Sequence, residues 1–151
     1  MLREELAAAQ TLAMEAKDAR AVSTIRLILA ALKDRDVAAW GKGNGQGIGE
    51  GEVLQMLRTM ITQRRESIEA YEKGCRMELA QQESDEINVI KRFLPEEMSD
   101  GDAAKAIKGL IEELGASNLK DMGRTMAALR KRYPGRMDFA KANGLVKAQL
   151  G

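Results

Sequence analysis

The sequence of 151 residues has no histidine, one cysteine, two prolines and 3% aromatic residues. The absence of histidine removes the commonest general base and the commonest transition-metal ligand, and Cys75 alone cannot assemble a thiolate metal site. Zinc hydrolysis and Ser-His-Asp or Cys-His nucleophilic catalysis are therefore excluded. We expect no catalytic residue, no metal and no cofactor.

The chain also lacks a long apolar run. No stretch approaches the roughly twenty apolar residues that a membrane-spanning helix needs, and the N-terminus is charged and amphipathic, without an apolar signal core. One cysteine offers no disulfide framework, which agrees with a reducing compartment. These absences predict a cytoplasmic protein without a membrane partner.

The apolar residues that are present favour helices. They make up 44% of the chain and are aliphatic, with many alanines and methionines, and they recur at helical spacing. The pattern predicts an all-α fold with no strand. The expected helices cover residues 2–17, 22–37, 53–73, 77–93, 100–114, 122–132 and 138–150.

Leu94 followed by Pro95 is the clearest boundary, because proline disfavours helix at the residue before it. We expect an N-terminal lobe of about four helices at residues 1–94. A C-terminal lobe of three helices is expected at residues 95–151.

Residues 40–51 contain a glycine at nearly every second position. Such density raises the entropy cost of ordering and predicts a mobile connector. A glycine-rich loop can also cradle phosphate, but the Walker-type Gly-Lys-Ser/Thr ending and the preceding strand are both missing.

Several charged side chains are assigned to solvated helix faces. Glu83, Asp85 and Glu86 lie close together and could do acid–base work, but their side of the helix is predicted to be wet. Arg58 and Arg64 are placed on the polar face of another helix, among surface ion pairs.

The formal net charge is only +1, so any basic surface must be local. Residues 120–147 hold eight basic side chains against Asp121 and Asp138, a local charge of 8 − 2 = +6. The eight are Lys120, Arg124, Arg130, Lys131, Arg132, Arg136, Lys141 and Lys147.

This cluster has two interpretations. Lysine and arginine contacts to phosphates dominate nucleic-acid affinity, so the cluster is a candidate RNA surface. Alternatively, Arg130, Lys131 and Arg132 only complement the negative C-terminal end of a helix dipole.

Motifs along nearly the whole chain resemble the GatB/YqeY family. In the first half they are Ala16-Lys17-Asp18, Thr24-Ile25-Arg26-Leu27-Ile28, Ala30-Ala31-Leu32-Lys33 and Gln63-Arg64-Arg65-Glu66-Ser67-Ile68, with Tyr71 and Gly74. In the second half they are Phe93-Leu94-Pro95, Gly115-Ala116-Ser117, Lys120-Asp121-Met122-Gly123, Met126, Gly135-Arg136 and Asp138.

The resemblance implies a C-terminal lobe similar to the tail domain of the B subunit of the Asp/Glu-tRNA amidotransferase. In that enzyme the tail engages the outer corner of tRNA, while the ligase and glutaminase chemistry, which uses glutamine as the amide donor, resides elsewhere. The resemblance therefore implies a tRNA-binding accessory module that is not catalytic alone. The expected partners are tRNA and an amidotransferase or another protein.

The resemblance and the charge cluster together predict a set of RNA contacts. These are Gly115, Ser117, Lys120, Arg124, Arg130, Lys131, Arg132 and Arg136. Gly123 is expected to permit close helix packing, and Asp121 to orient a basic side chain or cap a helix. The family's Gly-Arg-Ala-Asp-Gly is replaced at residues 135–139 by a segment in which Met137 and Phe139 add bulk beside the predicted contact.

A second function remains open, a helical protein–protein interaction module without RNA binding. Its methionine-rich and alanine-rich helical faces would dock on another protein, with Trp40 as an anchor.

Overall fold

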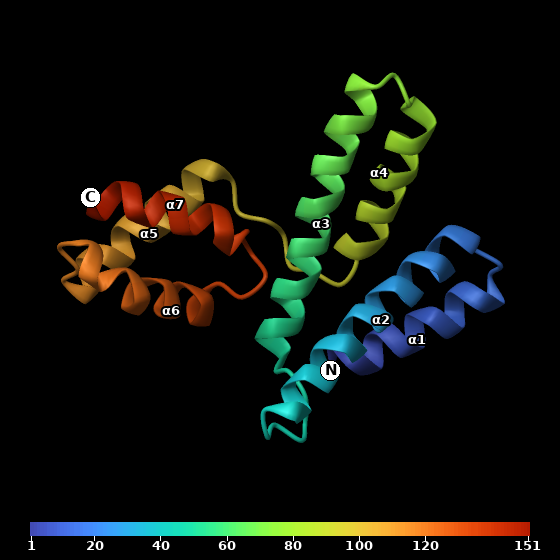
Figure 1. The fold of residues 1–151 in the computed structure, drawn as a ribbon, viewed down its shortest axis with the longest axis horizontal. Helices are drawn as coiled ribbons and strands as arrows, with labels where there is room; N and C mark the ends of the chain where they lie inside the picture. Colours follow the sequence, from blue (N-terminus) through green and yellow to red (C-terminus); the bar gives the residue numbers. More distant parts are fainter. The chain divides into compact units, whose positions relative to one another are not determined.

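The computed structural model describes residues 1–151 and contains helices but no strand, which confirms the all-α prediction (Figure 1). The chain divides into two compact units, Met1–Leu94 and Pro95–Gly151. Each unit has its own set of buried apolar side chains.

The N-terminal unit is built from two helical hairpins (Figure 1). The first joins α1 (Leu2–Glu15) to α2 (Ala19–Gly41), and the second joins α3 (Glu50–Lys73) to α4 (Met77–Lys91). Asp18 separates the first two helices and caps α2, because its carboxylate accepts a hydrogen bond from the amide of a residue in the first turn. α4 packs against both α2 and α3, so it joins the two hairpins.

The core of this unit is aliphatic and drawn from all four helices, as the composition predicts. The largest cluster contains Leu2, Leu6, Ile28, Leu32, Ile48, Val53, Met56, Leu57, Met60, Ile61, Ile87 and Ile90.

Two charged side chains that we predicted to be solvated are buried instead. Arg58 of α3 is 1% exposed and Glu86 of α4 is 8% exposed. Glu86 accepts a 2.9 Å hydrogen bond from Nε of Arg64 on α3. The prediction that Glu86 is solvated is wrong because α4 packs against two helices. Less of the surface of α4 is therefore exposed to solvent.

The glycine-rich connector is shorter and more tightly held than predicted. α2 continues through Trp40 and Gly41, and Ile48 at the far end of the loop is buried. Asp36 of α2 fixes this end, because its Oδ1 accepts hydrogen bonds from the Ile48 amide (2.9 Å) and from Arg3 Nη2 (2.7 Å).

Further contacts strengthen this anchor. Arg3 also donates to the Ile48 carbonyl oxygen at 2.8 Å. Burial acts to raise the pKa of Asp36, but the hydrogen bonds from Arg3 and Ile48 outweigh burial and lower that pKa. Gly47 adopts φ +82°, and a Cβ there would overlap the Asp36 carboxylate, so the loop requires glycine at this position.

The C-terminal unit contains three helices and a short 3-10 turn (Figure 1). The helices are α5 (Asp100–Leu114), α6 (Met122–Arg132) and α7 (Phe139–Leu150), and the 3-10 turn η1 (Leu119–Asp121) leads directly into α6. Ser99 caps α5 as its position predicts, since its hydroxyl accepts a hydrogen bond from the Asp102 amide.

The core of the C-terminal unit collects apolar side chains from all three helices and from the loop before α7. It contains Ala103, Ile107, Leu110, Met126, Leu129, Met137, Phe139, Ala142, Val146 and Leu150.

The end of α4 differs from the prediction. α4 ends at Lys91, earlier than the predicted end at Phe93, and residues 92–94 form turns before Pro95. The proline restricts the residue before it, and the helix has already ended when the chain reaches that point.

Candidate nucleic-acid interface

The outward face of α6 carries two of the predicted RNA contacts. Arg124, Ala127 and Lys131 are exposed and spaced three and seven residues apart, which places them on the same side of the helix. Met126 and Leu129 lie on the opposite side and are buried in the core of the unit. The amphipathic pattern of α6 therefore directs both cations to solvent.

The turn before α6 positions Lys120 at the end of the same helix. Gly115 ends α5 in the left-handed conformation, with φ +64°. The Asn118 side chain then accepts a hydrogen bond from the Lys120 amide at 2.9 Å, which starts η1. Lys120 is exposed and lies one turn before Arg124.

Asp121 organises this turn. Its Oδ2 accepts a 2.9 Å hydrogen bond from the Ser117 amide, and its Oδ1 pairs with Arg124 Nη2 at 3.0 Å. The pKa of Asp121 is lowered, mainly by the Ser117 hydrogen bond, with smaller contributions from the Asn118 amide and Arg124. Asp121 thus does orient a basic side chain, one of the two roles expected for it.

Two other predicted contacts are engaged within the unit. Arg132 forms a bidentate pair with Glu113 of α5, at 2.6 and 3.1 Å, and this pairing lowers the pKa of the Glu113 carboxyl. Arg136 donates from Nε to the Glu96 carbonyl oxygen at 3.2 Å. Both guanidinium groups hold segments of the unit together.

The remaining cations differ in their surroundings. Arg130 lies over the ring of Phe139, with 6.0 Å from its guanidinium carbon to the ring centroid. Lys120 and Lys131 have no ion pair within the unit. The structure therefore brings Lys120, Arg124 and Lys131 together along α6 and its preceding turn, and it assigns Arg132 and Arg136 to internal contacts.

Two expectations about side-chain size are corrected. A Cβ added at Gly123 would meet nothing within 4 Å, so this glycine does not serve close packing within the unit. It leaves the outer surface of α6 without a side chain beside Arg124. Met137 and Phe139 are each 4% exposed, so the bulk that they add points into the core and not toward the predicted contact surface.

Of the two acidic partners of these cations, Asp121 is expected from the sequence and Glu113 is not. Asp121 and Arg124 are three residues apart, a spacing that is visible in the sequence. Glu113 and Arg132 lie on different helices, and only the packing of α5 against α6 brings them together.

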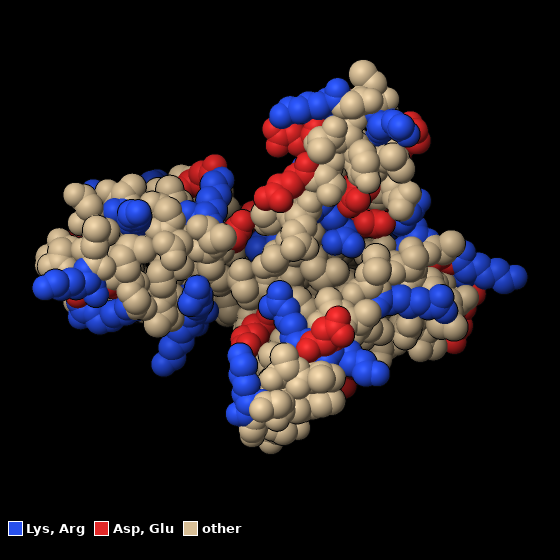
Figure 2. Space-filling model, in the orientation of Figure 1, with Lys and Arg blue, Asp and Glu red and all other residues tan.

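Over the C-terminal unit, Lys and Arg predominate over Asp and Glu on the face drawn in Figure 2. No three His, Cys, Asp or Glu side chains are gathered in a way that could hold a metal ion. The helices are each too short or too polar to cross a membrane.

The all-helical fold and the sequence motifs are typical of one family of small proteins. Comparison with known families gives the same family. The family model described as Yqey-like protein matches residues 3–150. The chain therefore belongs to the Yqey-like protein family.

Curated relatives come from yeasts. The chain is 33% identical over 108 residues to "Altered inheritance of mitochondria protein 41, mitochondrial" of Lachancea thermotolerans, covering 70% of this chain and 56% of that protein. The Saccharomyces cerevisiae protein of the same name is 30% identical over 104 residues, covering 68% of this chain and 54% of that protein. The chain thus spans about half the length of these relatives.

These relatives contradict the predicted cytoplasmic location, because their names describe mitochondrial proteins. The prediction is wrong for a physical reason. A lone cysteine and a charged, amphipathic start do not distinguish the cytoplasm from the mitochondrion.

Proposed function

We propose that the C-terminal unit binds tRNA through phosphate contacts made by the outer face of α6. The observation that carries this proposal is the grouping of Lys120, Arg124 and Lys131, of which the two lysines have no acidic partner. Cations without an intramolecular partner are free to replace the counterions of a phosphate backbone, and this exchange drives association.

The shape of the surface supports the same function. Gly123 and Ala127 present no long side chain between the cations, so a phosphate can approach the helix closely. Arg124 is held by Asp121 but is still 52% exposed, which leaves guanidinium donors available to an RNA oxygen. Contacts of this kind recognise the shape and backbone of RNA and do not read base edges.

The role that fits such a surface is that of an accessory module for a glutamine-dependent tRNA amidotransferase. The family resemblance supports it, since the C-terminal unit is similar to the tRNA-engaging tail of the amidotransferase B subunit. In this proposal the chain contributes binding, and a partner enzyme carries out the ligase chemistry.

The test compares two double variants by tRNA fluorescence anisotropy across a salt series. Lys120→Ala/Lys131→Ala removes the two unpaired cations of the surface, and Lys105→Ala/Lys108→Ala removes two exposed cations of α5. The net charge changes equally in both, and circular dichroism checks that helicity is unchanged.

We expect the first variant to bind at least tenfold more weakly at low salt. The slope of log affinity against log salt should fall by about 1.5, the value for two lost phosphate contacts. The α5 variant should stay within about twofold of the parent. Identical curves for the two variants, or no saturable binding of the parent at low salt, would reject the α6 surface and leave the protein-interaction module as the function.

A further inference from the structure

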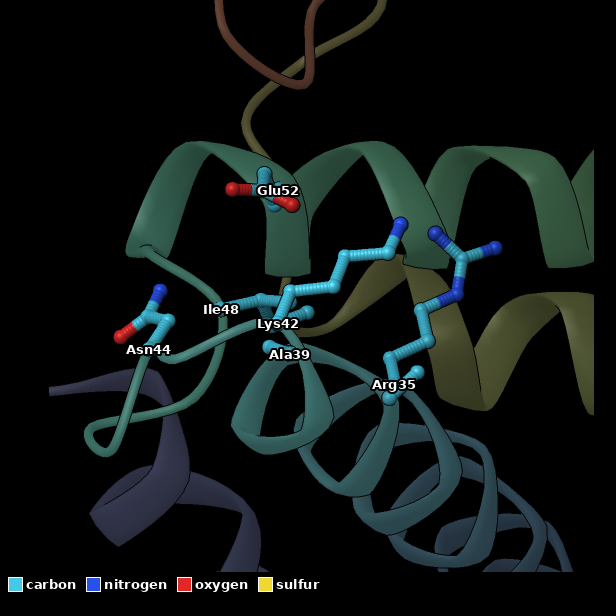
Figure 3. A pocket seen from close by; sticks show the side chains of 7 residues that line it. Arg35, Ala39, Lys42, Asn44, Ile48 and Glu52 are labelled. Atoms are coloured by element: carbon cyan, nitrogen blue, oxygen red, sulfur yellow. The ribbon is translucent and has the colours of Figure 1, made fainter.

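A groove in the N-terminal unit lies where the end of α2 meets the start of α3 (Figure 3). Its volume is about 450 Å³, within the range of small-molecule sites. The lining residues are Arg35, Ala38, Ala39, Lys42, Asn44, Ile48 and Glu52.

Two cations at the C-terminal end of α2 share one side of this groove. Arg35 lies in α2 and Lys42 is the residue directly after its end, and Figure 3 shows both side chains extending toward α3. Both are exposed and neither forms an ion pair. Two like charges that converge on one cavity repel each other, and an anion between them relieves the repulsion.

The other lining residues suit an organic molecule that carries an anionic group better than they suit an inorganic anion. Ala39 and Ile48 give an apolar floor. Asn44 offers an amide, and Glu52 on α3 offers a carboxylate that can accept hydrogen bonds. A carboxylate in a groove for an anion is favourable only when the ligand carries donor groups at a distance from its negative charge.

The groove is held in shape before any ligand arrives. Its floor residue Ile48 is buried, and its backbone amide and carbonyl are both hydrogen-bonded, to Asp36 and to Arg3. The wall formed by the loop is therefore fixed to α1 and α2, which lowers the entropy cost of binding.

We infer that this groove binds a 5′-phosphorylated nucleoside, either as a free mononucleotide or as one nucleotide of an RNA chain. The phosphate pairs with Arg35 and Lys42, and the planar base rests on the apolar floor. Donor groups of the base or ribose bond to Glu52, and Asn44 adds a polar contact at the other end. The site lies in the N-terminal unit and does not rest on tRNA binding by α6.

The site differs from a phosphate-binding glycine-rich loop. In such a loop the backbone amides of the glycines hold the phosphate, whereas here the charge comes from the side chains of Arg35 in the preceding helix and of Lys42 directly after it. The glycines of residues 43–49 instead allow the loop to turn back to Asp36.

The experiment titrates the ¹⁵N-labelled full chain with AMP, GMP, CMP and UMP and follows amide chemical shifts. Saturable shifts are expected for residues 35–52, with Arg35→Ala/Lys42→Ala weakening the binding at least tenfold. The matched control is Arg26→Ala/Lys33→Ala, which removes two exposed, unpaired cations from the same helix outside the groove. It should change the affinity less than about twofold.

Inorganic phosphate and the unphosphorylated nucleosides test the two halves of the ligand. Each should bind at least tenfold more weakly than the mononucleotide. Equal affinity for inorganic phosphate would overturn the proposal in favour of a simple anion site, and equal losses in the two variants or no saturable shift would also overturn it.

A short single-stranded RNA distinguishes the two sources of the nucleotide. Tighter binding of the RNA than of the mononucleotide assigns the site to an RNA chain, and equal binding assigns it to a free nucleotide. The Lys120→Ala/Lys131→Ala variant should keep its mononucleotide affinity, so failure of the α6 surface and failure of the groove give different results.

Discussion

The two units differ in whether they bury charged side chains. The N-terminal unit buries Arg58 and Glu86 and places Arg64, Glu83 and Glu86 in one partly buried cluster. The C-terminal unit buries no charged side chain, and its Arg132–Glu113 and Lys141–Asp100 ion pairs are exposed.

The difference shows which interactions specify the arrangement of the helices in each unit. Buried, paired charges cost free energy to desolvate, but they favour the one helix arrangement that pairs them. In the N-terminal unit the Arg64–Glu86 pair thereby fixes how α3 meets α4. The C-terminal unit relies on its apolar core and leaves cations such as Lys120 and Lys131 at the surface without an ion pair.

The largest expected effect tests whether the two cores are separate. Leu129→Ala removes a fully buried side chain from the C-terminal core and should lower the free energy of unfolding of that unit by about 4 kcal/mol. Urea unfolding followed by circular dichroism measures this loss. Trp40, the only tryptophan, reports on the N-terminal unit by fluorescence. The urea midpoint of its fluorescence transition should not change.

Leu119→Ala is the matched control, because Leu119 is 50% exposed and should contribute little. A shift in the urea midpoint of Trp40 fluorescence in Leu129→Ala would show that the two units unfold together. The comparison of two separate units would then not hold.

The next effect compares the same chemical change in both units. Glu86→Ala leaves the partly buried Arg64 without its 2.9 Å partner and should cost about 3 kcal/mol. Glu113→Ala breaks the exposed pair with Arg132, and water can replace the lost carboxylate, so the cost should be much smaller. Urea midpoints of the two variants measure the difference, and equal losses would contradict the contrast between the units.

The helices and the apolar core could be predicted from the sequence because both depend on local spacing. Ile107, Met126 and Leu129 recur at helical spacing in the sequence, and all three are buried. Ser99 is a residue type that favours helix N-termini, and it caps α5.

The buried charges and the loop anchor could not be predicted, because they depend on contacts between distant segments. Glu86 is buried by a second helix packing on α4, and Ile48 is fixed by Asp36 and Arg3 from two other helices. A pattern read along one helix does not contain this information.

Composition predicts the segment that carries the candidate RNA surface but not which of its cations are available. Counting charges found the basic segment, but Lys131 and Arg132 are neighbours in sequence and differ in structure, since only Arg132 reaches Glu113. The separation of available cations from engaged ones required the packing of α5 against α6.

The smallest expected effect concerns the charge cluster of the N-terminal unit. Burial raises the pKa of Glu83 above its ordinary 4.5, and the Glu86 carboxylate raises that pKa further against the opposing effect of Arg64. The folded state then binds a proton more readily than the unfolded state, so ionised Glu83 lowers stability at neutral pH. This cost should disappear as the pH falls through the raised pKa and below 4.5.

Glu83→Gln should therefore slightly stabilise the N-terminal unit at pH 7, and the gain should vanish at pH values below 4.5. Urea midpoints from Trp40 fluorescence at several pH values measure this, with Glu78→Gln as the exposed control on the same helix. If Glu83→Gln destabilises the unit at pH 7, the 3.9 Å attraction to Arg64 outweighs burial. The cluster would then need both carboxylates to balance its arginines.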